Sequence, residues 1–167
     1  MELLIFSDSH GKPDGMRRAI ALQKRRPDAI CFLGDGVYDT ESQDFAPLLW
    51  YTVAGNCDWG SLAFGNPTER QLPLEGHTLL LTHGHLFGVK SGYGALISHA
   101  AKCGADIVLF GHTHCPHEET IPAGTVIGDV TLERPMYLFN PGSVGESGWF
   151  GTLVLTPETV LFSHGRV

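Results

Sequence analysis

Short hydrophobic runs that end at polar, glycine-containing loops recur along the first part of the chain. The first run, Leu3–Phe6, contains no polar residue, which is typical of a strand buried on both faces of a sheet. Helical periodicity predicts helices over residues 13–25 and 93–103, and Gly104 is expected to end the second. Further strands are predicted over residues 28–33, 50–54, 70–74, 77–82 and 106–110.

Helical periodicity disappears after His114, where short hydrophobic runs lie between Gly and Pro turns. Strands are predicted there over residues 118–121, 125–130, 135–139, 151–155 and 159–163. Residues 37–47, with room for a short helix, and residues 59–67 are predicted as loops. A length of 167 residues suits one domain spanning residues 1–167. The pattern predicts an α/β (α+β) domain in which two mixed sheets stack and helices lie outside.

The composition restricts the classes of partner and the cellular location that are expected for the protein. The 11 basic and 18 acidic residues give a net charge of −7, which disfavours nucleic acid and anionic membranes as partners. No apolar run reaches the roughly 18 residues that a membrane-spanning helix needs. The four cysteines lack Cys-x-x-Cys spacing and nothing like a signal peptide precedes Asp8, so reduced thiols and a cytoplasmic location are expected.

The chain has nine histidines, and five of them fall in motifs that follow predicted strands. Because the carboxyl ends of parallel strands meet at one edge of a sheet, these side chains are expected to lie together. Imidazole nitrogens with carboxylate and amide oxygens, and without paired thiolates, suit Mn, Fe, Ni or Zn. Without His85, the motifs supply seven potential ligand side chains. This number exceeds the four ligands of one tetrahedral site and suits two ions that share a carboxylate. The candidates are Asp8, His10, Asp35, Asn56, His83, His112 and His114.

These motifs, taken in order, resemble those of a known family. Asp8-x-His10, Gly34-Asp35, Gly55-Asn56, His83 and Gly111-His112-Thr113-His114 are similar to the motifs of the calcineurin-like metallophosphoesterases. The stretches Gly55–Asp58, Thr82–His85 and Asn140–Ser143 resemble the small bacterial YfcE-like phosphodiesterases within that family. The resemblance implies a four-layer αββα sandwich of two mixed sheets, with a dinuclear metal site at the carboxyl ends of the strands.

The resemblance also implies how the ligands are divided. Asp8, His10 and His114 would hold one divalent ion, and Asn56, His83 and His112 would hold the other. Asp35 would bridge the two ions. Mn is the favoured metal, and Fe, Ni and Zn are the alternatives.

Cys57 marks a departure from most of the superfamily, in which His follows the motif Asn and contacts the substrate phosphate and the leaving group. A thiol with a pKa of about 8.5 is a poorer proton donor near neutral pH than an imidazolium. Asp58 resembles the acidic partner of that His and is expected to retain a role in loop geometry. Asn56 is expected to help place the phosphate. His85 is expected either to approach the substrate or to contact a metal through its backbone.

These observations predict a phosphodiesterase that hydrolyses a small phosphorylated substrate with a water activated by two metal ions. The candidate catalytic residues are Asp35, Asn56, Cys57 and Asp58. The alternative is a non-catalytic protein-binding scaffold of the same fold, similar to a retromer subunit. A nuclease is disfavoured by the net charge of −7. Trp149 and Phe150 are expected to line a substrate rim or to form a homo-oligomer contact.

Overall fold

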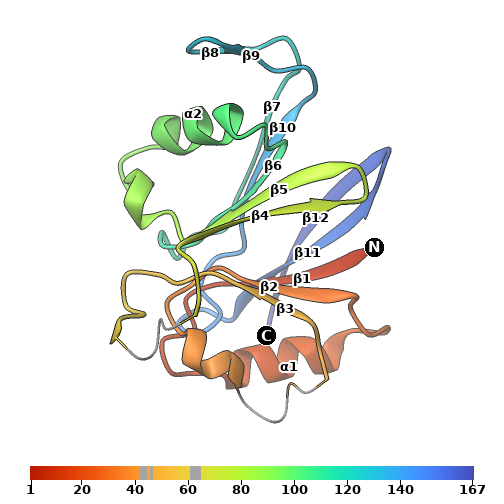
Figure 1. The fold of residues 1–167 in the computed structure, drawn as a ribbon. Helices are drawn as coiled ribbons and strands as arrows, with labels where there is room; N and C mark the ends of the chain where they lie inside the picture. The colour runs from red at the N-terminus through yellow and green to blue at the C-terminus, as the bar shows by residue number, and fades with distance from the viewer. Residues whose placement is uncertain (42–44, 46, 61–64) are drawn as a thin grey trace.

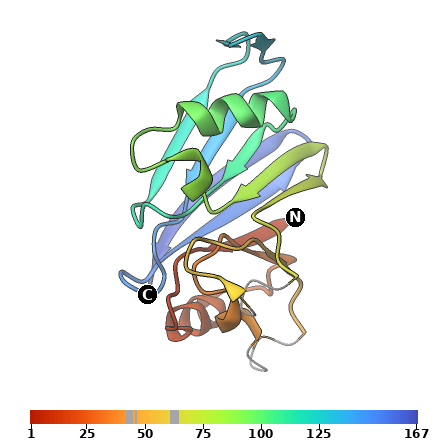
Figure 2. The same cartoon turned by 60° about the vertical axis from the view of Figure 1, so that its left-hand side comes forward.

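Two five-stranded sheets pack face to face, and one α-helix covers the outer face of each (Figure 1). The structure is a computed structural model that describes residues 1–41, 45, 47–60 and 65–167. The remaining parts of the predicted loops 37–47 and 59–67 lie outside the described residues. The arrangement confirms the expected four-layer αββα architecture, and Figure 2 shows the two helices on opposite sides of the paired sheets.

The first sheet combines three parallel strands with a C-terminal hairpin. Strands β1, β2 and β3 are parallel, whereas β11 pairs antiparallel with both β1 and β12. Its strands in spatial order are β12 (Thr159–Arg166), β11 (Trp149–Thr156), β1 (Glu2–Phe6), β2 (Ala29–Phe32) and β3 (Trp50–Thr52).

The second sheet also has a parallel centre. Strands β5, β6 and β10 are parallel, and the antiparallel strands β4 and β7 form its edges. The carboxyl ends of the parallel strands in both sheets carry the loops in which the candidate ligands lie. Its strands in spatial order are β4 (Glu69–Leu74), β5 (His77–Thr82), β6 (Ile107–Leu109), β10 (Met136–Asn140) and β7 (His117–Ile121).

The uninterrupted hydrophobic run of β1 serves two packing layers. Leu3 and Ile5 pack in the core between the sheets. Leu4 and Phe6 point the other way, into a cluster with Met16 of helix α1 (Asp14–Leu22). Each fully buried side chain of this size stabilises the fold by about 1.5–3 kcal/mol. Helix α2 (Gly94–Lys102) covers the second sheet in the same manner and ends before Gly104, whose φ is +69°.

The structure corrects three expectations. Helix α1 ends at Leu22 rather than at residue 25, because Gln23 is already extended. Residues 125–130 are not one strand, since Gly128 with a φ of +62° reverses the chain. The segment instead forms a projecting hairpin of β8 (Val126–Ile127) and β9 (Val130–Thr131). Strand β3 ends at Thr52 rather than at residue 54.

Helices in the described part of the chain are all too short or too polar to cross a membrane.

The hairpin between β4 and β5 turns through Glu75 and Gly76, whose φ angles are +50° and +78°. Positive φ costs a non-glycine residue roughly 1 kcal/mol, and Asn–Gly is the preferred pair in such turns. We expect Glu75→Asn to raise the free energy of unfolding by about 0.5–1 kcal/mol in urea denaturation. Gly76→Ala, the matched control, should lower it. An unchanged free energy of unfolding in both variants would contradict the interpretation that the turn is strained.

Candidate metal centre

Loops from both sheets bring the candidate ligands together. The loops after β1 and β2 supply Asp8, His10 and Asp35, and the loops after β5 and β6 supply the remaining histidines. Potential ligand atoms of Asp8, His10 and His114 lie within 4.8 Å of one another. The same limit holds for Asp35, His83 and His112, and for an overlapping group of His10, Asp35 and Cys57. The first group contains the three residues expected to hold one ion, and the second contains Asp35 with two of the three residues expected to hold the other.

Asp8 presents a buried oxygen that no hydrogen bond satisfies. Its Oδ2 accepts hydrogen bonds from Ser7 Oγ at 2.5 Å and from the His112 backbone N–H at 3.1 Å. Its Oδ1 is buried and lies 3.1 Å from His114 Nε2, and none of the described residues donates a hydrogen bond to it. Burial raises the pKa of the Asp8 carboxyl, against the opposing effects of His83 and Ser7. A cation beside Oδ1 would offset this cost of burial.

The imidazoles form two close pairs. His10 Nε2 lies 3.3 Å from His114 Nε2, and His112 Nδ1 lies 3.2 Å from His83 Nε2. Two nitrogens that bind one tetrahedral ion at about 2.0–2.1 Å are themselves separated by about 3.3 Å. Burial and the charge of His83 lower the pKa of His112 to about 4, which favours the neutral imidazole that a ligand must be. The side chains therefore fit divalent ions in both groups.

Hydrogen bonds behind the rings fix which nitrogen faces the centre. His83 Nδ1 lies 2.7 Å from the Leu33 carbonyl oxygen, to which it donates, and this leaves Nε2 toward Asp35. His114 Nδ1 lies 2.9 Å from Glu146 Oε2, and this leaves Nε2 toward Asp8. The hydrogen bond and charge of His114 lower the pKa of the Glu146 carboxyl. Such outer partners orient metal-binding histidines.

Asp35 lies between the two groups. Its Oδ2 is 3.3 Å from His83 Nε2 in one group and 3.9 Å from His10 Nε2 in the other. Its Oδ1 accepts a hydrogen bond from the Cys57 backbone N–H at 2.7 Å. Burial opposes ionisation of Asp35, but His83 and the Cys57 N–H outweigh it and lower the pKa of the carboxyl. Gly55 is required beside it, because a Cβ there would collide with Asp35 Oδ1.

Backbone strain is concentrated at this centre. Among the described residues, six that are not glycine have positive φ, and only Glu75 of these lies outside the ligand loops. Strained conformations persist where the surrounding structure fixes them, and they gather at functional sites. The other five are Asp8, His10, Asp35, His112 and His114.

The loop after β3 is held by Asp58. The Asp58 carboxylate accepts backbone hydrogen bonds at 2.7–3.0 Å from residues 35, 36, 37 and 55. This agrees with the expected role in loop geometry. Asn56 and Cys57 are exposed, with Asn56 Nδ2 3.4 Å from Cys57 Sγ. Loss of solvent around the thiol, and then the Asp35 carboxylate, raise the pKa of Cys57 to about 11.

His85 faces the second group from the side. Its ring centroid lies 5.4 Å from that of His83 and 6.2 Å from that of His112. Its Nδ1 is buried and has no hydrogen-bond partner in the part of the chain that the structure describes. Burial and the charge of His83 lower the pKa of His85, so its imidazole is neutral near pH 7.

The turn at residues 140–143 supports the centre. Asn140 Nδ2 donates to the Gly111 carbonyl oxygen at 2.8 Å, and Ser143 Oγ donates to the Asp8 carbonyl oxygen at 2.9 Å. Phe150 was expected at a rim or an oligomer contact, but it is 7% exposed and packs in the cluster beneath α1. Sequence reasoning also missed Glu146, because it lies 32 residues after His114 and outside every motif.

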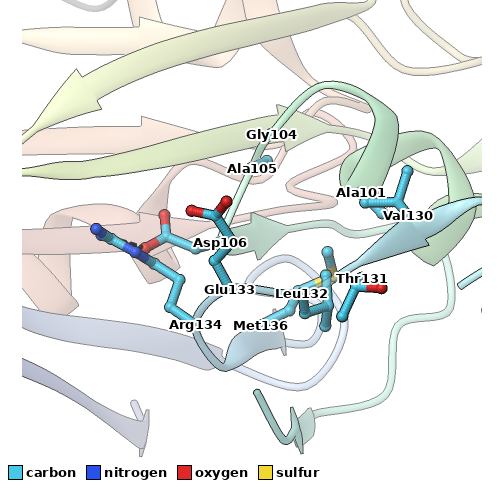
Figure 3. Close-up of a pocket in the computed structure, with 10 residues that line it drawn as sticks. All are labelled: Ala101, Gly104, Ala105, Asp106, Val130, Thr131, Leu132, Glu133, Arg134 and Met136. Atoms are coloured by element: carbon cyan, nitrogen blue, oxygen red, sulfur yellow. Dashed lines mark hydrogen bonds and ion pairs between the residues drawn. The ribbon is translucent and has the colours of Figure 1, made fainter. Parts of the chain in front are cut away.

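A hollow of about 250 Å³ lies between the end of α2 and the segment that leads from β9 into β10. Figure 3 shows the residues that line it. Its buried carboxylate, Asp106, already accepts hydrogen bonds from the Thr78 backbone N–H at 2.7 Å and from Arg134 at 3.2 Å. His77 Nδ1 lies 2.7 Å from the same carboxylate. These polar groups are mutually satisfied, in contrast with Asp8.

Comparisons with known proteins agree with the geometry. A model of the calcineurin-like phosphoesterase superfamily domain matches residues 1–159. The chain is 30% identical over 144 residues to the probable metallophosphoesterase YsnB of Bacillus subtilis (strain 168), covering 86% of this chain and 75% of that protein. It is 28% identical over 165 residues to the phosphodiesterase YfcE of Escherichia coli (strain K12), covering 86% and 79% of the two chains.

A solved structure of Vps29 from Entamoeba histolytica, a single mutant, has the same fold. It matches with a TM-score of 0.72 and 17% identity, over 100% of this chain and 99% of that one.

Glu146→Ala should weaken binding of Mn²⁺ by about 10–100-fold, because His114 loses the partner that orients its ring. Isothermal titration calorimetry would measure this. Glu119→Ala is the matched control, since Glu119 pairs with His117 at 3.2 Å, outside both ligand groups. Equal Mn²⁺ affinity in the two variants would show that Glu146 does not support the centre.

Proposed function

Because the chain belongs to the calcineurin-like phosphoesterase superfamily, we propose that it is a metal-dependent phosphodiesterase. One observation carries this proposal: the buried Oδ1 of Asp8, which accepts no hydrogen bond from the described residues, lies 3.1 Å from His114 Nε2. The position of Asp35, within 4 Å of one histidine of each pair, supports it. Two bound divalent ions would supply Lewis acidity and a water of lowered pKa for attack on phosphorus.

We assign the ligands as the resemblance to the family implies. Asp8, His10 and His114 would hold one ion, and His83 and His112 would hold the other together with Asn56. Asp35 would be shared, since its Oδ2 faces one histidine of each group. Mn is the proposed metal, with Fe, Ni and Zn as alternatives, because the donors are nitrogen and oxygen.

The remaining residues of the site would position the substrate. The exposed Asn56 amide and the neutral His85 ring are suited to donate hydrogen bonds to phosphate oxygens. Cys57, with its raised pKa, would remain a neutral thiol and a weak proton donor. Asp58 would act as a positioning residue through its four backbone hydrogen bonds. Esters with good leaving groups, which depart without a proton, are therefore the favoured substrates.

A protein-binding scaffold of the same fold is the second candidate, favoured by Cys57 in place of the usual acid and by the likeness of fold to Vps29. A scaffold has no need to keep every ligand. In this chain all seven ligand positions are filled. Turnover by the metal-loaded protein separates the two candidates.

Asp35→Asn should lower turnover of bis(p-nitrophenyl) phosphate by more than about 100-fold. This is a larger loss than that caused by removing a residue that only hydrogen-bonds to a metal ligand. An amide cannot neutralise two dications. The measurement is the release of p-nitrophenolate by Mn²⁺-loaded protein, with the metal content determined in parallel. Asp129→Asn, at an exposed carboxylate in the β8–β9 turn, is the control. Absence of turnover in wild-type protein with two ions bound would favour the scaffold.

Cys57→Ala should leave turnover of aryl diesters nearly unchanged, because activation of water by the ions does not involve the thiol. Cys57→His should increase turnover of alkyl diesters more than of aryl diesters, since a general acid is worth about 10²–10⁴-fold for poor leaving groups. A leaving-group series on wild type and both variants measures this. If Cys57→Ala abolished aryl hydrolysis while both ions stayed bound, the thiol would be a catalytic residue.

A further inference from the structure

A cavity of about 310 Å³ opens directly beside the two ligand groups. His10 and Asp35 belong both to its lining and to the ligand groups. A phosphate bound at the centre would therefore direct one of its ester groups into this space. Tyr38 and Cys57 lie on the cavity wall.

Tyr38 is an exposed aromatic residue on a firmly anchored turn. Its side chain is 65% exposed, yet it belongs to the 3₁₀ turn Val37–Glu41, in which Val37 is 2% exposed. The Val37 N–H donates to Asp58 Oδ1 at 3.0 Å, and Thr40 Oγ1 donates to the Val37 carbonyl oxygen at 2.7 Å. A ring carried on a fixed turn offers contact area at a small cost in conformational entropy.

The charges around the cavity select a neutral group. Asp39 already accepts hydrogen bonds from Ser9 Oγ at 2.5 Å and from the Gly11 N–H at 2.9 Å. Asp35 and Asp58 are also engaged by backbone N–H groups. Among the described residues that line the cavity, none is Lys or Arg. A second phosphate in the cavity would be repelled by three carboxylates without a compensating Lys or Arg. A neutral planar ring would avoid this repulsion and could contact the Tyr38 ring.

We propose that Tyr38 is a specificity-determining residue that stacks on a neutral planar ring in the ester group of the substrate. The preferred substrate class is then a singly charged phosphodiester that carries an aryl group or a nucleobase, rather than a nucleotide polyphosphate. This inference rests on the proposed function, because the ions must hold the phosphate. Ring pairs prefer offset or edge-to-face contact, and such geometry is open to an exposed side chain.

Phosphonates test the inference without turnover. Binding of phenylphosphonate, thymidine 5′-methylphosphonate, propylphosphonate and inorganic phosphate to Mn²⁺-loaded protein is measured by calorimetry. We expect a ring-bearing probe to bind wild type about two- to tenfold more tightly than propylphosphonate. Tyr38→Ala should remove this preference, and Tyr38→Phe should retain it. The ring-bearing probe whose affinity falls in Tyr38→Ala identifies the ring as aryl or nucleobase.

The control is Glu41→Ala, on the same turn, because Glu41 lines a neighbouring hollow and not this cavity. The Glu41→Ala variant should prefer the ring-bearing probes over propylphosphonate to the same extent as wild type. Equal affinity for propylphosphonate and both ring-bearing probes, or a preference that survives Tyr38→Ala, would overturn the role of Tyr38 and leave the proposed function intact. If even inorganic phosphate failed to bind the Mn²⁺-loaded protein, the proposed function itself would fall.

Discussion

The unsatisfied Oδ1 of Asp8 is the constraint on which the centre depends. A buried carboxylate oxygen without a hydrogen bond is costly, and a cation beside it would offset that cost. The surrounding loops keep it in place, since Ser7 and the His112 N–H occupy the other oxygen. Ser143 holds the Asp8 carbonyl group from behind. The left-handed conformations of the ligands are a further cost, which the rest of the fold must offset.

The centre belongs to neither sheet alone. Asp8, His10 and Asp35 follow strands of the first sheet, whereas His83, His112 and His114 follow strands of the second. Each ligand group therefore draws from both sheets. The relative placement of the sheets, set by the packing between Leu3 and Ile5 of β1 and the second sheet, determines whether the ligands meet. Packing in the core and geometry at the centre are thus coupled.

The sequence predicted the features that a local pattern encodes, including the buried run of β1, the two strands on either side of Glu75 and the order of the ligand motifs. It also indicated the family, which the match over residues 1–159 confirms. Contacts between residues far apart in the chain could not be predicted from the sequence. Glu146 reaches His114 only through the folded loops, and nothing near Tyr38 in sequence indicates a cavity wall. The hairpin β8–β9 was missed because residues 125–130 are rich in β-branched side chains, as in a single strand, while Gly128 reverses the chain within them.

The pairing of β1 with β11 has a consequence for synthesis on the ribosome. Glu2 lies opposite Val154, and the amino group of Met1 donates to the Leu155 carbonyl oxygen at 2.8 Å. A nascent chain that displays Asp8 early cannot complete its first sheet until residues near 155 have left the exit tunnel. Until then β1 remains a hydrophobic edge available to other chains. Exposure of this edge during synthesis thus lasts until the β11–β12 hairpin has emerged.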